Sequence, residues 1–197
     1  MKKIFLVTAI CLCSIGALYA QSNTSVYYSI GFATGDLSDY IGQPSFRGVG
    51  LDYNKMIQPN IGVGFSIGWN VFYEAKSYDT YTVDNISLSG KQYRYSNHWP
   101  MLLSGSYYLK PGEAINPFVG LGVGTIYTLR NTNMNLYTVE LDAWNFALQP
   151  QVGVQFSVDD ATAITVVAKY NNAFQAGGEL NTDQSYFTIN IGFAFIR

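Results

Sequence analysis

Cysteine is almost missing from this sequence. The 197 residues contain two cysteines, Cys11 and Cys13, and both fall in the first 20 residues. That stretch begins Met-Lys-Lys, continues as an apolar run to Leu18 and ends at Ala20, which predicts a secretory signal peptide over residues 1–20. The run is shorter than the roughly 20 residues that a membrane-spanning helix needs. Removal of the signal would leave no cysteine, so the disulfides that stabilise many small exported domains are excluded.

Charge is scarce as well. Charged residues make up 12% of the chain, against roughly 25% in soluble domains, and the net charge is −2. The chain has no basic footprint, which excludes nucleic acid as a partner. His98 is the only histidine and the predicted mature chain has no cysteine, so nothing indicates a site of the zinc type, and we expect no metal or cofactor. After residue 20, no apolar stretch is long enough for a transmembrane helix.

What the sequence has instead is alternation with the period of a β-strand. From Ile61 to Val71 every odd position is large and apolar, and every even one is Gly, Ser or Asn. The same pattern predicts eight strands: 24–35, 46–56, 61–75, 97–110, 117–130, 139–158, 162–173 and 184–197.

The connections between these strands alternate in length. Three are tight turns, at 57–60, 111–116 and 159–161. The others are longer, near 36–45, 76–96, 131–138 and 174–183. Short turns at one end and long loops at the other are typical of outer-membrane barrels. We therefore expect an all-β fold over residues 21–197: a closed antiparallel transmembrane β-barrel of eight strands, with both termini at the short-turn end.

Charge also indicates which face of the barrel points outward. A soluble barrel keeps its apolar face inside and covers the other face with Lys and Glu. Here the other face consists of Gly, Ser, Asn, Gln and Thr. Aromatic residues on the apolar face concentrate near both strand ends, among them Trp99 and Trp144 at one end and Tyr107 and Phe156 at the other. Two such bands are typical of membrane interfaces, so the bulky face is expected to meet lipid.

Three segments resemble a known family. Residues 99–109, WPMLLSGSYYL, and 116–124, NPFVGLGVG, are similar to strands of the outer-membrane β-barrel-domain family, which includes the barrels of outer membrane proteins A, X and W. Residues 185–195 resemble the C-terminal signal of such barrels, although Ile196 and Arg197 follow the last aromatic residue. The resemblance implies a location in the bacterial outer membrane and the outer-membrane assembly machinery as a partner. It implies no catalytic residue.

Two charges fall within strands on the predicted inner face. Asp52 and Lys169 would be costly on the lipid face, so we expect them to form one polar network in the lumen. Its other members would be Asn54, Gln149, Gln151 and Asn171. A structural plug is the favoured interpretation, and a gate is the alternative. Pro100 and Pro150 also lie within strands, where a missing donor predicts local bulges.

The candidates for chemistry are few. Gly120, Gly122 and Gly124 lie on the inner face of a strand rather than at a strand-to-helix turn, so they do not predict a nucleotide site. His98, with Ser96 and Glu74, would lie near the outer rim, where some barrels of this shape modify lipid A. Pro100 occupies the place of the serine in the His-x-Ser spacing of the deacylases. We therefore predict a rim histidine and no enzyme.

Three functions remain open. The favoured one is a structural or surface-interaction role through the long loops. Its contact surface would be the loop 76–96, with Tyr78, Tyr81, Tyr93 and Tyr95. The second is a narrow conduit for small or apolar solutes, and the third is a lipid A-modifying enzyme at the rim. Eight strands leave room for side chains or one small ligand rather than a wide pore. We expect a monomer in contact with outer-membrane lipids and lipopolysaccharide.

Overall fold

The computed structural model describes residues 21–83, 86–134, 136–174, 180 and 182–197. The predicted signal peptide, 1–20, lies outside the described residues. Within them the chain forms eight strands and one short helix, α2 (Asp36–Tyr40). No helix among the described residues has the length and apolar character needed to cross a membrane. The strands are β1 (Ser22–Ala33), β2 (Ser45–Gln58), β3 (Ile61–Val83), β4 (Ile86–Tyr108), β5 (Ile115–Met134), β6 (Tyr137–Ser157), β7 (Thr162–Ala173) and β8 (Tyr186–Ile196).

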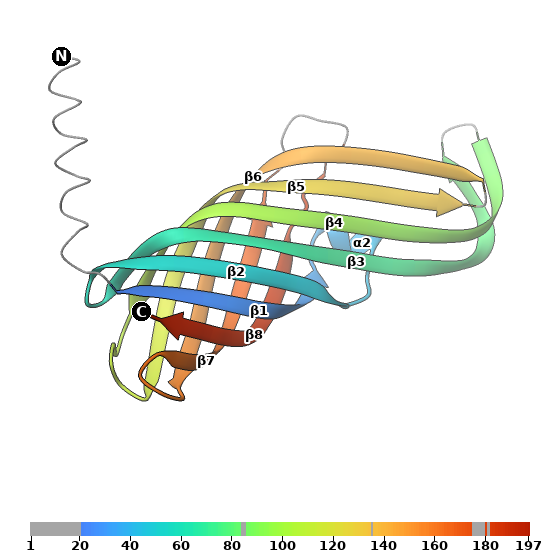
Figure 1. Ribbon diagram of the computed structural model, residues 1–197. Coiled ribbons are helices and arrows are strands. Elements are labelled where there is room, and N and C mark those ends of the chain that lie inside the picture. Colours follow the sequence, from blue (N-terminus) through green and yellow to red (C-terminus); the bar gives the residue numbers. More distant parts are fainter. Residues whose placement is uncertain (1–20, 84–85, 135, 175–179, 181) are drawn as a thin grey trace, which may run out of the picture.

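The strands close into a ring. Each pairs antiparallel with its neighbour in the chain, and β8 pairs with β1 from Asn23 opposite Ile196 to Ala33 opposite Tyr186. The predicted eight-stranded closed barrel is therefore confirmed (Figure 1). The Ser22 amide donates to the Arg197 carbonyl at 2.5 Å, so the start of β1 and the end of the chain meet at the short-turn end.

The two faces of the barrel follow the alternation. On β3, Val63, Phe65 and Ile67 point outward and are exposed, whereas Ser66 and Asn70 point inward and are buried. Large exposed apolar residues occur on every strand, which in water would be a patch far larger than soluble monomers carry. A bilayer removes that cost, because lipid tails cover the same surface.

The strands differ in length more than the sequence predicted. β3 and β4 have 23 residues each, β5 has 20 and β6 has 21, whereas β1, β2, β7 and β8 have between 11 and 14. The prediction of loops at 76–96 and 131–138 is wrong, because most of these residues continue the strands. Lys76 pairs with Gln92, and Asn133 pairs with Thr138. These segments carry polar residues on both faces, which hides the period of a strand once no face meets lipid. Figure 1 shows the four strands extending past the rest of the barrel.

The bulges predicted at the two prolines are absent. The ladder between β3 and β4 keeps one register from Ile67 opposite Met101 to Asn70 opposite His98, on either side of Pro100. β6 and β7 likewise keep their register across Pro150. A proline has no backbone N–H to donate to the neighbouring strand. At both prolines the ladder therefore loses one hydrogen bond, and no extra residue is inserted as a bulge. The shift that does occur in β3 lies between Lys76 and Asp79.

The long strands should project from the cell. We expect a membrane-impermeant maleimide to label Tyr78→Cys and Leu136→Cys on intact cells, since these side chains are 71% and 98% exposed near the ends of β3 and β5. Ala114→Cys and Asp160→Cys, in the tight turns, should react only after the outer membrane is permeabilised. Equal labelling of all four variants on intact cells would contradict this orientation.

Candidate functional site

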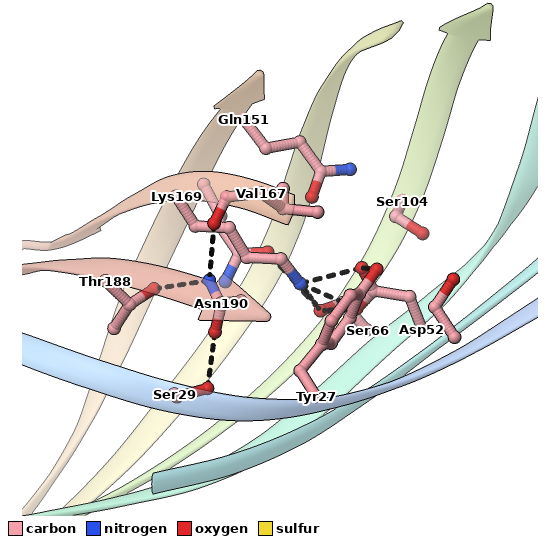
Figure 2. Close-up of polar contacts among 12 residues, drawn as sticks. Tyr27, Ser29, Asp52, Ser66, Ser104, Gln151, Val167, Lys169, Thr188 and Asn190 are labelled. Carbon is pink, nitrogen blue, oxygen red and sulfur yellow. Dashed lines mark hydrogen bonds and ion pairs between the residues drawn. The ribbon is translucent and has the colours of Figure 1, made fainter. Parts of the chain in front are cut away.

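The centre of the barrel holds an ion pair. The Lys169 ammonium lies 2.7 Å from both carboxylate oxygens of Asp52. The two side chains are 6% and 4% exposed. They come from β7 and β2, which are separated around the ring by β8 and β1, so the contact crosses the lumen (Figure 2).

Neighbouring hydroxyl groups complete the coordination of both charges. Ser66 donates to one carboxylate oxygen of Asp52 at 2.6 Å, and the Tyr27 hydroxyl donates to the other at 3.0 Å. Lys169 also donates to Ser66 at 3.2 Å, and its ammonium lies 4.9 Å from the centre of the Tyr27 ring. A buried charge is tolerated only when it is paired and hydrogen-bonded, and both conditions hold here.

The remaining predicted network residues divide into two groups. Gln149 and Asn171 join the ion pair through Ser66, with Ser66 to Gln149 at 3.3 Å and Gln149 to Asn171 at 2.7 Å. Asn54 and Gln151 are buried nearby but bond elsewhere. Asn54 accepts from Ser104 at 3.5 Å, and Gln151 donates to Ser106 at 3.4 Å.

Sequence reasoning missed Tyr27 and Ser66. A signal for both was present, because each lies at an inward position of its strand. Tyr27 does not stand out in the sequence because it precedes a second tyrosine, Tyr28, which points outward. A serine among glycines on β3 does not stand out in a sequence, although its hydroxyl is what bridges Asp52, Lys169 and Gln149.

The glycines of β5 make room for this interior. Gly120 pairs with Gln151 and Gly122 with Gln149 on β6. A side chain at Gly120 would lie 2.5 Å from the Gln151 amide nitrogen, and one at Gly122 would lie 3.3 Å from the Gln149 Cβ. The glycine pattern therefore lets long amide side chains cross a narrow barrel.

Apolar layers lie on either side of the polar centre. Toward the tight turns, the buried cluster consists of Tyr27, Met56, Tyr108, Phe118 and Val167. A second buried cluster lies toward the other end and consists of Leu37, Ile41, Phe72, Leu102, Ile126, Ala147, Ala173 and Tyr186.

Two spaces among the described residues of the interior are small or closed at one end. A hollow of about 320 Å³ opens at the short-turn end and ends on Met56 and Tyr108. A cavity of about 20 Å³ beside Lys169 and Gln149 has room for a single water molecule. Side chains therefore fill the interior between these layers.

Helix α2 closes the outer end of the barrel. Leu37 and the adjoining Ile41 are completely buried in the outer apolar layer. The Tyr40 ring lies between two guanidinium groups, 4.9 Å from Arg94 and 4.0 Å from Arg130, and its hydroxyl is 2.6 Å from Thr132. Burial raises the pKa of Tyr40, so the phenol stays neutral and holds the helix to β4 and β5.

His98 lies inside the barrel rather than at its rim. It is completely buried, with Ser96 at 2.9 Å from Nε2 and Thr128 at 3.1 Å from Nδ1. Glu74, the carboxylate expected beside it, instead pairs with Lys76 at 2.6 Å. The rim prediction was wrong because Trp99 takes the outward position and turns His98 inward. In the described residues the histidine contacts hydroxyls and aromatic rings, and no group of His, Asp and Glu that could hold a metal ion is found.

The four predicted contact tyrosines lie on the projecting hairpin of β3 and β4. Tyr78 and Tyr93 are exposed. Tyr95 packs against Tyr73, with ring centres 4.8 Å apart, and the Tyr81 hydroxyl donates to the Ser77 carbonyl at 2.6 Å. The hairpin therefore presents two of the four as open contact surface and uses the others partly to stiffen itself.

Removal of one partner of the ion pair should cost more than removal of both. Asp52→Asn or Lys169→Met alone should destabilise the barrel by about 3–5 kcal/mol, because each leaves the opposite charge buried without its partner. The double variant should be more stable than the sum of the two effects predicts. Urea unfolding in lipid vesicles, followed by tryptophan fluorescence, measures all four proteins. Additive effects would mean that the two charges do not depend on each other.

Known proteins share this architecture. The solved structure of the outer membrane protein OprG from Pseudomonas aeruginosa is 13% identical and covers 90% of this chain and 96% of its own, with a TM-score of 0.58. Ail, the attachment invasion locus protein of Yersinia pestis, is 12% identical over 90% and 100% of the two chains, with a TM-score of 0.55. Neisserial surface protein A is 10% identical over 89% and 95%, with a TM-score of 0.52. Identities this low establish the fold alone.

A family model decides the relationship at the level of sequence. No curated protein matches the chain closely enough to count as a relative. The model of the outer membrane protein β-barrel domain matches residues 5–195, nearly the whole sequence. Together with the closed ring and its lipid-facing surface, this match establishes an outer-membrane location and confirms the resemblance noted in residues 99–109 and 116–124. The chain belongs to the outer membrane protein β-barrel domain family.

Proposed function

We propose that this protein is a closed, non-enzymatic barrel that presents its projecting strands to a partner at the cell surface. The observation that carries the proposal is the length of β3 and β4. Each has 23 residues, whereas a tilted strand crosses a bilayer in roughly 9–11. The excess corresponds to about 40 Å along the strand. Membrane anchoring alone gives no reason for such an extension.

The composition of the projecting hairpin suits contact with another molecule. Residues 76–95 contain four tyrosines together with Ser, Thr, Asp, Asn and Gly. Tyrosine supplies a large rigid contact area at low entropic cost, and small polar residues supply adaptable hydrogen bonds. Tyr78 and Tyr93 are the exposed aromatic residues of the predicted set. We infer that these two contribute most to binding.

The interior supports this choice over the alternatives. The ion pair between Asp52 and Lys169, the two apolar layers and helix α2 occupy the route that a solute would follow. A catalytic role has less support still, because His98 is fully buried and has no carboxylate partner among the described residues.

A shortened hairpin tests the proposal. Lys76 and Gln92 pair in the ladder, so an Asn-Gly turn can replace residues 77–91 while the barrel below is kept. Cells that display the intact protein should clump, or should be retained on one or more surfaces coated with heparin, fibronectin, collagen or mucin. The shortened variant should lose at least tenfold of that retention, because the contact area is gone.

Tyrosine variants provide the matched control. Tyr78→Ser with Tyr93→Ser should weaken retention severalfold, whereas Tyr107→Ser with Tyr170→Ser, which changes two exposed tyrosines below the projecting hairpin, should not. Unaltered retention by the shortened barrel, or neither clumping nor retention by the intact one, would overturn the proposed function.

A further inference from the structure

A groove lies on the lipid-facing surface where β1, β2 and β3 run side by side. Tyr28 and Trp69 form its walls, Val49 lies between them, and its volume is about 430 Å³. Val49 pairs with Tyr28 on one side and with Trp69 on the other, so a smaller side chain separates two large rings in adjacent strands. The result is an apolar hollow in the lipid-facing surface with a large ring on either side.

Hydrogen bonds hold both walls of this groove in place. The Tyr28 hydroxyl donates to the Phe46 carbonyl. The Trp69 indole nitrogen donates to the Asn97 side-chain oxygen at 3.3 Å. The Trp69 ring is nearly parallel to the Trp99 ring, with the ring centres 6.4 Å apart and an angle of 4° between the planes. Aromatic side chains fixed in this way lose little freedom when a ligand binds, so the groove is already organised for an occupant.

Arg47 closes the outer end of the groove. It is exposed on β2, and none of the ion pairs among the described residues involves it. Its guanidinium lies 5.3 Å from the centre of the Tyr73 ring, which fixes its direction without neutralising its charge. A second hollow of about 200 Å³ adjoins Arg47 on the side of Pro44 and Phe46. The cation thus stands between an apolar groove and an open hollow.

The position of Arg47 fits the outer membrane–water interface. β2 begins at Ser45, next to the connection that carries α2, and ends at the tight turn after Gln58. Arg47 is therefore close to the outward end of the strand, and Val49 lies deeper. Trp69 also belongs to an aromatic row that continues through Trp99, Tyr127 and Trp144. Such rows mark the level of the lipid headgroups.

We propose that this groove binds one phosphorylated acyl lipid of the outer leaflet. Its hydrocarbon chain lies over Val49 between Tyr28 and Trp69, and its phosphate pairs with the Arg47 guanidinium. The planar guanidinium of arginine can donate two parallel hydrogen bonds to phosphate oxygens. Because none of the ion pairs among the described residues involves Arg47, its donors are available for a phosphate. The site requires only that the barrel spans the outer membrane, so it stands apart from the proposed role of the projecting hairpin.

Lipid retention by the intact barrel tests the site. The barrel in detergent micelles is titrated with hexa-acylated bisphosphoryl lipid A, or with the same lipid after removal of its phosphates, and bound copies are counted by native mass spectrometry. We expect one saturable copy of the phosphorylated lipid. Arg47→Gln should weaken its binding about tenfold, to the level of the dephosphorylated lipid. Val49→Phe should weaken both lipids, because the ring fills the groove at a side chain that is 54% exposed.

Lys55 supplies the matched control. It is also exposed and outward on β2, but it lies at the short-turn end, away from the groove. Lys55→Gln should leave retention unchanged. Equal losses for Arg47→Gln and Lys55→Gln would indicate bulk attraction between charges and would overturn the site. Unchanged lipid binding by Val49→Phe would also overturn the site. A phosphate bound by Arg47 alone would not need the groove.

Discussion

Closure of the hydrogen-bonded ring is the constraint on which the rest of this structure depends. In a bilayer every backbone donor and acceptor has to be satisfied within the protein, and a sheet achieves this only when it has no edge. The pairing of β8 with β1 removes the edge. With eight strands the ring is narrow, so each inward side chain faces others across the lumen. Outward positions can then be uniformly apolar, while inward positions have to pack together.

The interior shows what that packing demands. Glycines on β5 leave space that Gln149 and Gln151 fill from β6, and Asp52 meets Lys169 across the barrel. An ion pair in a buried site contributes little to stability by itself, but each charge requires the other. The pair therefore ties β2 to β7 across the lumen, and apolar layers lie above and below it. The gate interpretation would need these layers to open together with the ion pair.

Sequence patterns predicted the barrel well and the projecting part poorly, for one physical reason. Where lipid covers one face, as from Ile61 to Val71, the alternation is strict and the strand is unmistakable. Beyond the bilayer both faces of a strand meet water, so residues 76–83 lose the apolar period although they continue the ladder. The position of His98 was misjudged because Trp99, the next residue, points outward, and the alternation of a strand then turns His98 inward. Contacts across the lumen, such as that of Ser66 with Gln149, depend on distances between strands that no local pattern encodes.

Ion conductance across a planar lipid bilayer tests the central claim, that the interior is filled, most directly. Purified barrel inserted at neutral pH should give no steady conductance steps above those of the protein-free membrane, because the Asp52–Lys169 pair, both apolar layers and α2 block the lumen. Frequent, long-lived conductance steps of uniform size from the unmodified protein would contradict the account.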